Sequence, residues 1–285
     1  MEIVNSVVDT VASADLPWEE TTIMPIGDIQ LGAQGVNLEK LKRHLDWGMM
    51  HGSYFIGMGD YVDVASPSNR AALRATRLYD SVQDMIEDGA ARAVEDVLKV
   101  LSGTEDRWLG LLEGHHLYEF RDGTTSDTRI AQALRAPFLG SCAFVRLHFR
   151  RKNSDSSRVC TIWCHHGAGG GNKAASPLNK LENLLPYFDA DIYLMGHMSK
   201  KVAAPIDQLY MSEGKNSKLR YRTKLLAGTG AWLQGYTQGS KDGNNPRGSY
   251  VERAVMNPTA LGGVVITVRP VHHQDTDRLD LNVSL

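Results

Sequence analysis

The chain has 285 residues and a formal net charge of −2, with 31 Lys and Arg residues against 33 Asp and Glu residues. This length suits one large domain or two small ones, each able to bury a full hydrophobic core. No run of about 18 apolar residues occurs, so we expect no membrane span. The near-neutral charge argues against a protein that holds nucleic acid mainly through phosphate attraction, but it is compatible with a local basic patch.

The first 20 residues contain acids and no basic start, so they do not predict a signal peptide. Cys160 and Cys164 fall in one strand-like run, where four residues at about 3.3 Å each separate them by about 13 Å. A disulfide needs Cα atoms within about 7 Å of each other, so these two cysteines cannot pair. With Cys142 as the third cysteine, we expect reduced thiols and a cytoplasmic protein.

Short apolar runs alternate with helical patterns along most of the chain. Asn37 is placed to cap the first helix, and Ser126 or Asp127 the third. Residues 143–151 and 157–166 are expected to form a hairpin around a polar turn. The expected strands are 21–28, 53–60, 107–116, 143–151, 157–166, 190–197, 201–206, 218–230 and 261–271, and the expected helices are 38–50, 81–101, 126–136 and 179–188.

This alternation, followed by a strand-rich end, predicts an α/β sandwich with mixed sheets rather than a purely parallel sheet. Residues 1–20 and 273–285 are interpreted as an N-terminal and a C-terminal tail. The remaining residues, 21–272, are predicted to form one domain.

Expected strands end in acids or histidines that stand beside glycines. Ligands of open α/β sheets bind outside the carboxyl ends of the strands. Crowded carboxylates repel one another unless a cation neutralises them, and neutral imidazoles favour a transition metal. One aspartate after a strand usually caps a turn or a helix, but five such ends together predict a metal centre. The five ends are Gly27-Asp28-Ile29-Gln30, Gly59-Asp60-Tyr61-Val62-Asp63, Gly114-His115-His116, His165-His166-Gly167 and Gly196-His197-Met198-Ser199.

This ordered set resembles the calcineurin-like metallophosphoesterase family. The five blocks of that family run Asp-x-His, Gly-Asp-x-x-Asp, Gly-Asn-His, His and Gly-His-x-His, and they stand here as GDIQ, GDYVD, GHH, HHG and GHMS. Residues 249–268 are similar to viral and bacterial members of the group. The resemblance implies a four-layer α/β/β/α sandwich, with two mixed β-sheets flanked by helices and a two-metal site at the strand ends.

Three positions depart from the family pattern. Gln30 replaces the histidine of the first block, His115 the asparagine of the third, and Ser199 the last histidine. Carried over, the first metal site consists of Asp28, Gln30 and a shared Asp60, with Ser199 as a further candidate. This oxygen-only set favours Mn²⁺ or Mg²⁺, held weakly and with more water.

The second site implied by the resemblance keeps three nitrogens and one carboxylate. This set suits Zn²⁺, Fe or Mn²⁺, so we expect two divalent ions, of which the one at Asp28 and Gln30 is bound more weakly. His166 is preferred over His165 because the family ligand is often followed by glycine. His165 remains a further candidate, which on a strand would face the opposite side. The ligands of the second site are Asp60, His115, His166 (or His165) and His197.

Catalytic groups are also implied by the resemblance. His116 aligns with the family histidine that lies near the leaving group and stabilises or protonates it. Asp63, the last residue of the second block, is a further candidate for the site. Arg121 follows in the same loop and is a candidate for a bidentate contact with phosphate, although a solvated surface arginine fits the sequence equally well.

These residues predict a metal-dependent phosphoesterase, because two metal ions supply a hydroxide and clamp an in-line phosphoryl transfer. The segment 232–250 is aromatic, glycine-rich and basic, which suits a nucleic acid or nucleotide substrate, although a mobile surface loop fits the sequence equally well. Lys200 and Lys201 add positive charge after the last block. A protein phosphatase is less favoured, because Val64-Ala65 stands where those enzymes have Arg-Gly. No protein partner and no membrane are predicted.

Other interpretations of the same residues are weaker. Gln30 and Ser199 also fit a scaffold that kept the phosphoesterase fold as a binding protein and lost most of its catalysis. The glycine-rich run at 167–173 lacks the Gly before Lys and the Ser or Thr after it that a phosphate-binding P-loop needs. A structural zinc cluster of Cys160, Cys164 and the two adjacent histidines fails, because residues of one strand cannot all converge on one ion.

Overall fold

The computed structural model describes residues 6–8, 11–152, 157–212, 217–241, 246, 248–273 and 276–285. Within this part of the chain the helices are α1 (Leu38–Met50), α2 (Pro67–Ala75), α3 (Asp80–Leu101), α4 (Ser126–Ala133), α5 (Ser176–Leu184) and α6 (Tyr250–Arg253). The strands are β1 (Ser6–Val8), β2 (Val11–Pro17), β3 (Thr21–Ile26), β4 (Tyr54–Gly57), β5 (Trp108–Leu111), β6 (Cys142–Arg150), β7 (Ser157–His165), β8 (Ile192–Met195), β9 (Lys201–Met211), β10 (Leu219–Ala231), β11 (Gly262–Gly263), β12 (Val265–His273) and β13 (Thr276–Ser284).

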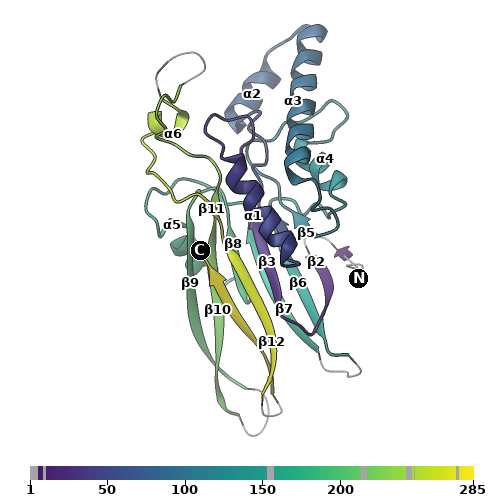
Figure 1. Ribbon diagram of the computed structural model, residues 1–285, viewed down its shortest axis with the longest axis vertical. Coiled ribbons are helices and arrows are strands. Elements are labelled where there is room, and N and C mark those ends of the chain that lie inside the picture. The colour runs from purple at the N-terminus through teal and green to yellow at the C-terminus, as the bar shows by residue number, and fades with distance from the viewer. Residues whose placement is uncertain are drawn as a thin grey trace.

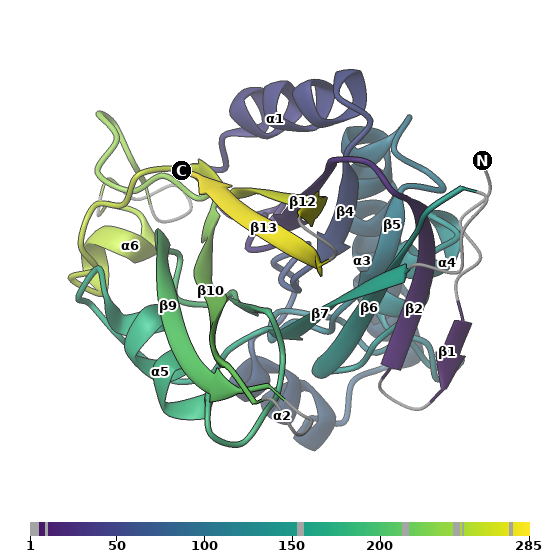
Figure 2. The ribbon, with the colours of Figure 1, turned by 90° about the horizontal axis from the view of Figure 1, so that it is seen from below.

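The strands form two mixed sheets that face each other (Figures 1 and 2). The larger sheet has the order β1-β2-β6-β7-β8-β10-β11, with β9 paired to β10. The smaller sheet has the order β13-β12-β3-β4-β5. In the larger sheet β7, β8 and β10 run parallel, and in the smaller one β3, β4 and β5 do. The carboxyl ends of the strands that precede the site motifs therefore meet at one end of the sandwich.

Three apolar clusters hold four layers together. The first lies between the sheets and includes Ile23 of β3 and Val145 of β6. The second packs the smaller sheet, at Phe55, against α1, α3 and α4. The third packs the larger sheet, at Tyr193, against Leu181 of α5. This mixed α/β architecture is the one expected from the sequence.

Local signals in the sequence placed several elements correctly. Asn37 caps α1, because its Oδ1 accepts a hydrogen bond from the Lys40 backbone N–H at 2.9 Å. The expected hairpin is the antiparallel pair β6 and β7, and all three cysteines are free. Helix α4 is capped by Thr125, which forms a capping box with Thr128. The expectation that Ser126 or Asp127 caps this helix is wrong, because both side chains are buried in other contacts.

The segments interpreted as tails contain strands of the two sheets. Strand β2 runs parallel to β6 and buries Ala12, Ala14 and Leu16. Strand β13 pairs with β12 along its whole length, and Leu279 and Leu281 pack against the core between the sheets. Both segments alternate apolar and polar residues with a period of two, which is the strand pattern. Small alanines and interspersed acids made that alternation weak in the sequence.

Helix α2 was not expected from the sequence. It begins after Ser66, whose side chain caps it, and has Pro67 in its first turn. None of its residues is buried, so the helix adds no side chain to the apolar core. Among the described helices, none combines the length and the apolar composition that crossing a membrane requires.

Candidate metal centre

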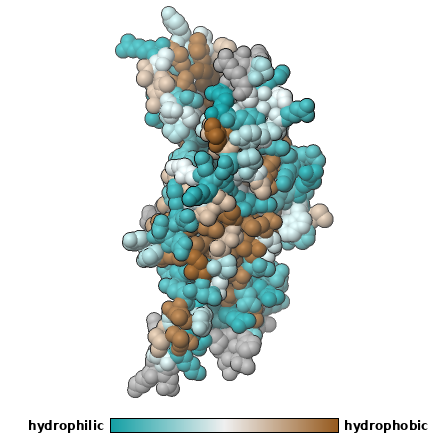
Figure 3. Space-filling view, turned by 90° about the vertical axis from the view of Figure 1, so that its left-hand side faces the viewer, coloured by the Kyte–Doolittle hydropathy of each residue, from teal (hydrophilic) through white to brown (hydrophobic). Residues whose placement is uncertain are grey.

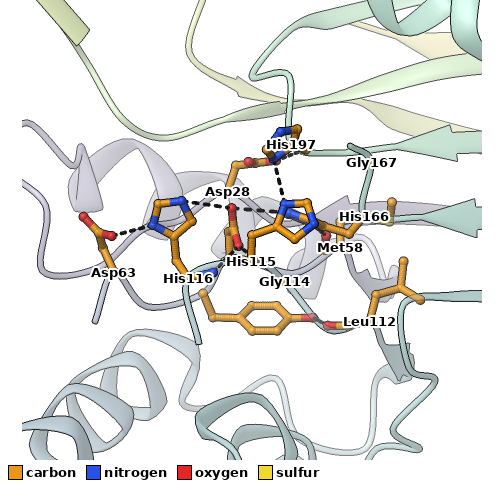
Figure 4. A network of polar contacts seen from close by, with 12 residues as sticks. Asp28, Met58, Asp63, Leu112, Gly114, His115, His116, His166, Gly167 and His197 are labelled. Atoms are coloured by element: carbon orange, nitrogen blue, oxygen red, sulfur yellow. Dashed lines mark hydrogen bonds and ion pairs between the residues drawn. The ribbon is translucent and has the colours of Figure 1, made fainter. Parts of the chain in front are cut away.

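Loops that follow five different strands meet at one end of the sandwich (Figure 4). Backbone hydrogen bonds join them: the Asp28 N–H donates to the Gly59 carbonyl at 2.9 Å, and the His197 N–H donates to Asp28 Oδ2 at 2.8 Å. The backbone N–H groups of His115 and His116 both donate to Asp60 Oδ1. The sheet edge therefore brings together the acids and histidines that the sequence motifs singled out.

Two glycines permit this close approach. A Cβ atom on Gly59 would collide with the His166 ring and with Gly114. A Cβ on Gly114 would overlap both the backbone and the carboxylate of Asp60. Glycine at these positions is a steric requirement of the loop crossing, since no larger residue leaves room for the neighbouring loop.

The backbone at the strand ends is strained. Residues Asp28, Asp60 and His197 adopt left-handed conformations with φ of 48°, 54° and 64°. Gln30 and Ser199 do the same, with φ of 50° and 54°. A left-handed backbone costs a residue with a Cβ about 1–2 kcal/mol. Such strain tends to concentrate at functional sites, where it fixes the direction of a side chain.

Three imidazoles form the centre of the cluster. The ligand nitrogens of His115, His166 and His197 all lie within 4.8 Å of one another. The ring of His115 stands almost perpendicular to the other two, at interplanar angles of 85° and 86°. Nδ1 of His115 lies 3.2 Å from Nδ1 of His197. Nitrogens that point at a common centre in this way are the arrangement that a transition metal ion requires.

His166 is oriented by the backbone of a neighbouring loop. Its Nδ1 lies 2.7 Å from the Met58 carbonyl, which can only accept, so Nδ1 carries the hydrogen. Its Nε2 lies 3.3 Å from Asp60 Oδ2. A carbonyl that holds one ring nitrogen and leaves the other free is the usual arrangement behind a metal-binding histidine.

Three buried polar atoms in this cluster have no hydrogen-bond partner: Asp28 Oδ1, Asp60 Oδ2 and His166 Nε2. Leaving a buried polar group unpaired costs about 1–3 kcal/mol, and more for a charged group. Each of these atoms is a common metal donor, and each lies at the same sheet edge. The donor set therefore fits one or more divalent ions.

The charges of the cluster also indicate a need for a cation. Burial raises the pKa of Asp28 to about 7, although His166 works against the rise. Burial lowers the pKa of His197 to about 4, with a further contribution from the positive charge of His166. Burial also lowers the pKa of His166, but the carboxylate of Asp60 has the larger, opposite effect and raises this pKa to about 9. In the absence of a metal, a proton on His166 is the main charge opposing the buried acids.

His116 lies beside the cluster and not inside it. Its Nδ1 is 2.6 Å from Asp63 Oδ1, and its Nε2 is 4.0 Å from Asp60 Oδ2. The hydrogen bond that its ring donates to Asp63 raises the pKa of His116, and burial opposes this rise. A quarter of its side chain is exposed, at 25%, so the ring lies at the mouth of the site.

The other predicted ligands lie around this centre. The Gln30 backbone N–H donates to the Asp60 carbonyl at 2.9 Å, which places the backbone of Gln30 beside that of Asp60. Ser199 is half-buried, two residues after His197. His165 accepts a hydrogen bond from the Gly167 backbone and stacks on Trp163, so the structure brings His166 and not His165 into the cluster.

The structure does not support a phosphate contact by Arg121. Its guanidinium pairs with Asp84 at 2.9 Å and with Glu87 at 3.5 Å, both on α3. Its backbone N–H also donates to Glu87. The sequence shows that Arg121 lies in the same loop as His116, but it does not show that the acids of α3 pair with this arginine.

The sequence motifs did not predict that Arg70 contacts the site. Its Nη1 donates to the carbonyls of Ala65 at 2.8 Å, His115 at 2.6 Å and Leu117 at 3.2 Å. This guanidinium therefore holds the loop that carries His115 and His116. A positioning role of this kind leaves no motif, because it depends on α2 lying over a loop 45 residues away.

Asp127 was considered only as a helix cap. Its Oδ2 accepts the Gly114 N–H at 2.8 Å, which ties α4 to the same loop, and burial raises its pKa to about 6. Because a buried carboxylate is costly unless it is hydrogen-bonded, this contact fixes the start of the loop.

The segment 232–250 does not offer Trp232 for stacking. That side chain is 1% exposed, and its ring lies 5.2 Å from the ring of His44. Its backbone N–H donates to the Asp28 carbonyl at 3.2 Å, so it supports the loop that carries Asp28. Residues 242–245 and 247 of this segment lie outside the described residues.

No protein-family model matches the sequence, and a search of curated proteins returns no match. Among solved structures, the chain is similar to Vacuolar Protein Sorting 29 from Cryptosporidium parvum, with 12% identity, 93% of this chain and 98% of that chain covered, and a TM-score of 0.34. It is similar to Vps29 from Entamoeba histolytica in complex with zinc, with 10% identity, coverage of 92% and 99%, and a TM-score of 0.35. It is also similar to a predicted phosphoesterase from Streptococcus pneumoniae, with 13% identity, coverage of 92% of this chain and 88% of that chain, and a TM-score of 0.33. Likeness at this level carries no conclusion about the site or the activity.

We expect Arg70→Gln to weaken metal binding by about 10- to 100-fold, as the loss of an outer contact to a ligand loop usually does. Arg74→Gln is the matched control, since Arg74 lies on the same helix and also pairs with Glu119 but, unlike Arg70, is not bonded to the carbonyl of His115. Calorimetric titration of the chelated proteins with Mn²⁺ and Zn²⁺ measures both. Equal affinities for the two variants would remove Arg70 from the site.

His44 predicts a specific acid sensitivity. Burial lowers its pKa to about 4, and Lys201 and Lys40 beside it add to this shift. The folded chain thus binds this proton less readily than the unfolded chain, so the stability contributed above pH 6.5 is lost as the pH falls towards 4. When the pH is lowered from 7 to 4, the free energy of unfolding of His44→Gln should fall by about 2–3 kcal/mol less than that of the wild type. Urea unfolding with chelator present measures this difference, and parallel pH profiles would contradict it.

Proposed function

We propose that the chain is a metal-dependent phosphoesterase. The observation that carries this proposal is the set of buried, unpartnered donor atoms on Asp28, Asp60 and His166 at the sheet edge. Two further imidazoles point at the same place, and a histidine–aspartate pair stands beside it. Metal-activated hydrolysis needs these two components, a clamp for cations and a proton donor next to it.

The nitrogen-rich ion would be held by Asp60, His115, His166 and His197, and the oxygen-rich one by Asp28, Gln30 and Asp60 with Ser199 nearby. When bound, the two ions supply Lewis acidity towards the phosphate oxygens and lower the pKa of water. Asp60 is suited to serve both sets. Its Oδ1 is fixed by two backbone N–H groups, which leaves Oδ2 for the ions.

His116 would act as the proton donor to the leaving group. Its Nδ1 hydrogen is held by Asp63, so the ring presents Nε2 to the site. Asp63 keeps the ring in this orientation and favours its protonated form. An imidazolium at the mouth of the site can release its Nε2 proton to an alkoxide that departs from phosphorus.

For the substrate we propose a phosphodiester or phosphomonoester of a nucleotide or nucleic acid. The glycine-rich segment 168–170 is exposed beside the His166 loop, which lets a large substrate approach the backbone closely. Lys200 and Lys201 follow the His197 loop directly and supply positive charge. We further propose a cytoplasmic location, from the reduced thiols.

A second candidate is a binding scaffold with weakened catalysis. It is favoured by Gln30 and Ser199, because neither offers an imidazole to the Asp28 side of the site. Among the described residues, the cluster of convergent metal-ligand atoms contains only the three histidines of the other side. An activity measurement separates the two candidates.

Hydrolysis of bis-p-nitrophenyl phosphate in the presence of Mn²⁺ tests the proposed function. We expect turnover that Asp60→Asn abolishes, because this change removes the carboxylate shared by both sets of ligands. Asp46→Asn, an exposed position on α1, is the control and should keep full activity. Absence of turnover with Mn²⁺, Zn²⁺, Fe²⁺ and Mg²⁺ would favour the scaffold.

The role of His116 predicts a dependence on the leaving group. His116→Asn should lower kcat by about 10²- to 10⁴-fold for esters of poor leaving groups such as alkyl alcohols. For p-nitrophenyl esters the loss should be small, because nitrophenolate departs without a proton. Asp63→Asn should show the same pattern in a milder form. An equal loss with both classes of ester would contradict proton donation by His116.

The unequal donor sets predict two unequal metal affinities. Calorimetric titration of chelated protein with Mn²⁺ should show one tight and one weak binding event. Gln30→His supplies the missing imidazole and should strengthen the weak event while leaving the tight one unchanged. Two equally tight sites in the wild-type chain would refute this asymmetry.

A further inference from the structure

A long hairpin of β9 and β10 extends from the larger sheet at the end opposite the metal centre (Figure 1). Its register pairs Leu209 with Tyr221 and Met211 with Leu219. Since side chains alternate across a strand, these four residues share one face of the hairpin. Nearer the body of the protein, the same face carries Leu225 into the core between the sheets.

This first face of the hairpin is apolar and open to solvent. Leu209, Met211, Leu219 and Tyr221 are 55%, 59%, 61% and 69% exposed. Figure 3 looks at the side of the molecule that carries β9 and α5, and it shows hydrophobic groups gathered in its lower half. Contiguous exposed apolar groups on a soluble domain usually mark a binding surface.

The second face of the hairpin is cationic. It carries Arg220, Arg222 and Lys224, and the last two line a cavity of about 630 Å³ together with Tyr187 and Tyr210. Lys224 is only 3% exposed, and its Nζ lies 3.1 Å from both Asp189 Oδ1 and the Tyr193 hydroxyl. A buried ammonium at the wall of an open cavity offers a strong, fixed point for an anion.

The carboxylates near these cations do not neutralise all of their positive charge. Arg222 pairs with Asp191 at 2.9 Å, and it shares Asp189 with Lys224. Arg220 has no ion pair within the described residues, so three cations face two carboxylates. The Asp189 side chain is 76% exposed, whereas that of Lys224 is 4% exposed. The cations are therefore open to solvent on the side of Asp189, where another carboxylate can approach.

The outer edge of β9 is free. In the part of the chain that the structure describes, β9 pairs only with β10. Sheet edges are usually protected by proline or by charged residues, and Pro205 and Asp207 do so nearer the body of the protein. From Gln208 to Met211 neither proline nor a charged residue occurs. This stretch therefore presents backbone hydrogen-bonding groups that an incoming strand can pair.

We propose that an extended segment of a protein partner, with alternating apolar and acidic residues, adds to the free edge of β9. Backbone pairing would place its apolar side chains beside Leu209 and Met211. Its acidic side chains would then lie on the second face, near Arg222 and the cavity. A second copy of this chain fits less well, because pairing two β9 edges would bring two cationic faces together.

The test uses two labelled ten-residue peptides, one alternating glutamate with valine and the other lysine with valine. Fluorescence anisotropy with the full chain should show saturable binding of the glutamate peptide only. Arg220→Glu should weaken that binding at least tenfold and allow the lysine peptide to bind. Arg43→Glu, at an exposed position on α1, is the charge-matched control and should change neither peptide's affinity.

Three outcomes would overturn the proposal: no saturable binding of the glutamate peptide, equal binding of both peptides, or a glutamate-peptide affinity that Arg220→Glu leaves unchanged. A concentration-dependent dimer that Tyr221→Glu dissolves would assign the edge to a second copy and also overturn it. Because the hairpin lies away from the metal centre, Asp60→Asn should not alter peptide binding. The result is thus independent of the proposed activity.

Discussion

Two buried carboxylates share one sheet edge with three imidazoles, of which one is buried, and the carboxylates repel each other unless a cation lies among them. Protein hydrogen bonds meet only part of this need. Asp60 Oδ1 has two backbone donors, whereas Asp28 Oδ1 has no hydrogen-bond partner and Asp60 Oδ2 has only the ion pair with His166 Nε2 at 3.3 Å. Burying a charge without compensation costs several kcal/mol. The proton on His166 offsets some of that cost, and divalent ions would offset far more.

The rest of the fold serves to hold these groups in place. The core between the sheets and the core under α1, α3 and α4 fix the strands, and the strands fix where their loops begin. Strained left-handed residues then aim the side chains, and glycines let the loops cross. Behind them, Arg70 and Asp127 clamp the loop of His115 from two different helices. This support explains how a set of charged groups can stay buried and convergent.

Much of this arrangement follows from local patterns. The strand-end motifs predict Asp28, Asp60, His115, His166 and His197 as neighbours, because parallel strands end at a common edge. The features that the sequence did not predict depend on contacts between residues that lie far apart along the chain. Arg121 pairs with an acid of α3, and Trp232 is buried in the core. Arg70 contacts the loop of His115 from α2, a helix with no buried residue. Strands β2 and β13 were taken for tails because their alternation is carried by small or partly exposed residues.

Anomalous diffraction from crystals grown with Mn²⁺ would locate ions at this sheet edge. We expect a strong peak within coordination distance of Asp60 Oδ2, His166 Nε2 and a His197 ring nitrogen, with a weaker one on the Asp28 side. Crystals that show no peak at these loops, with both carboxylates satisfied by other hydrogen bonds, would contradict this expectation.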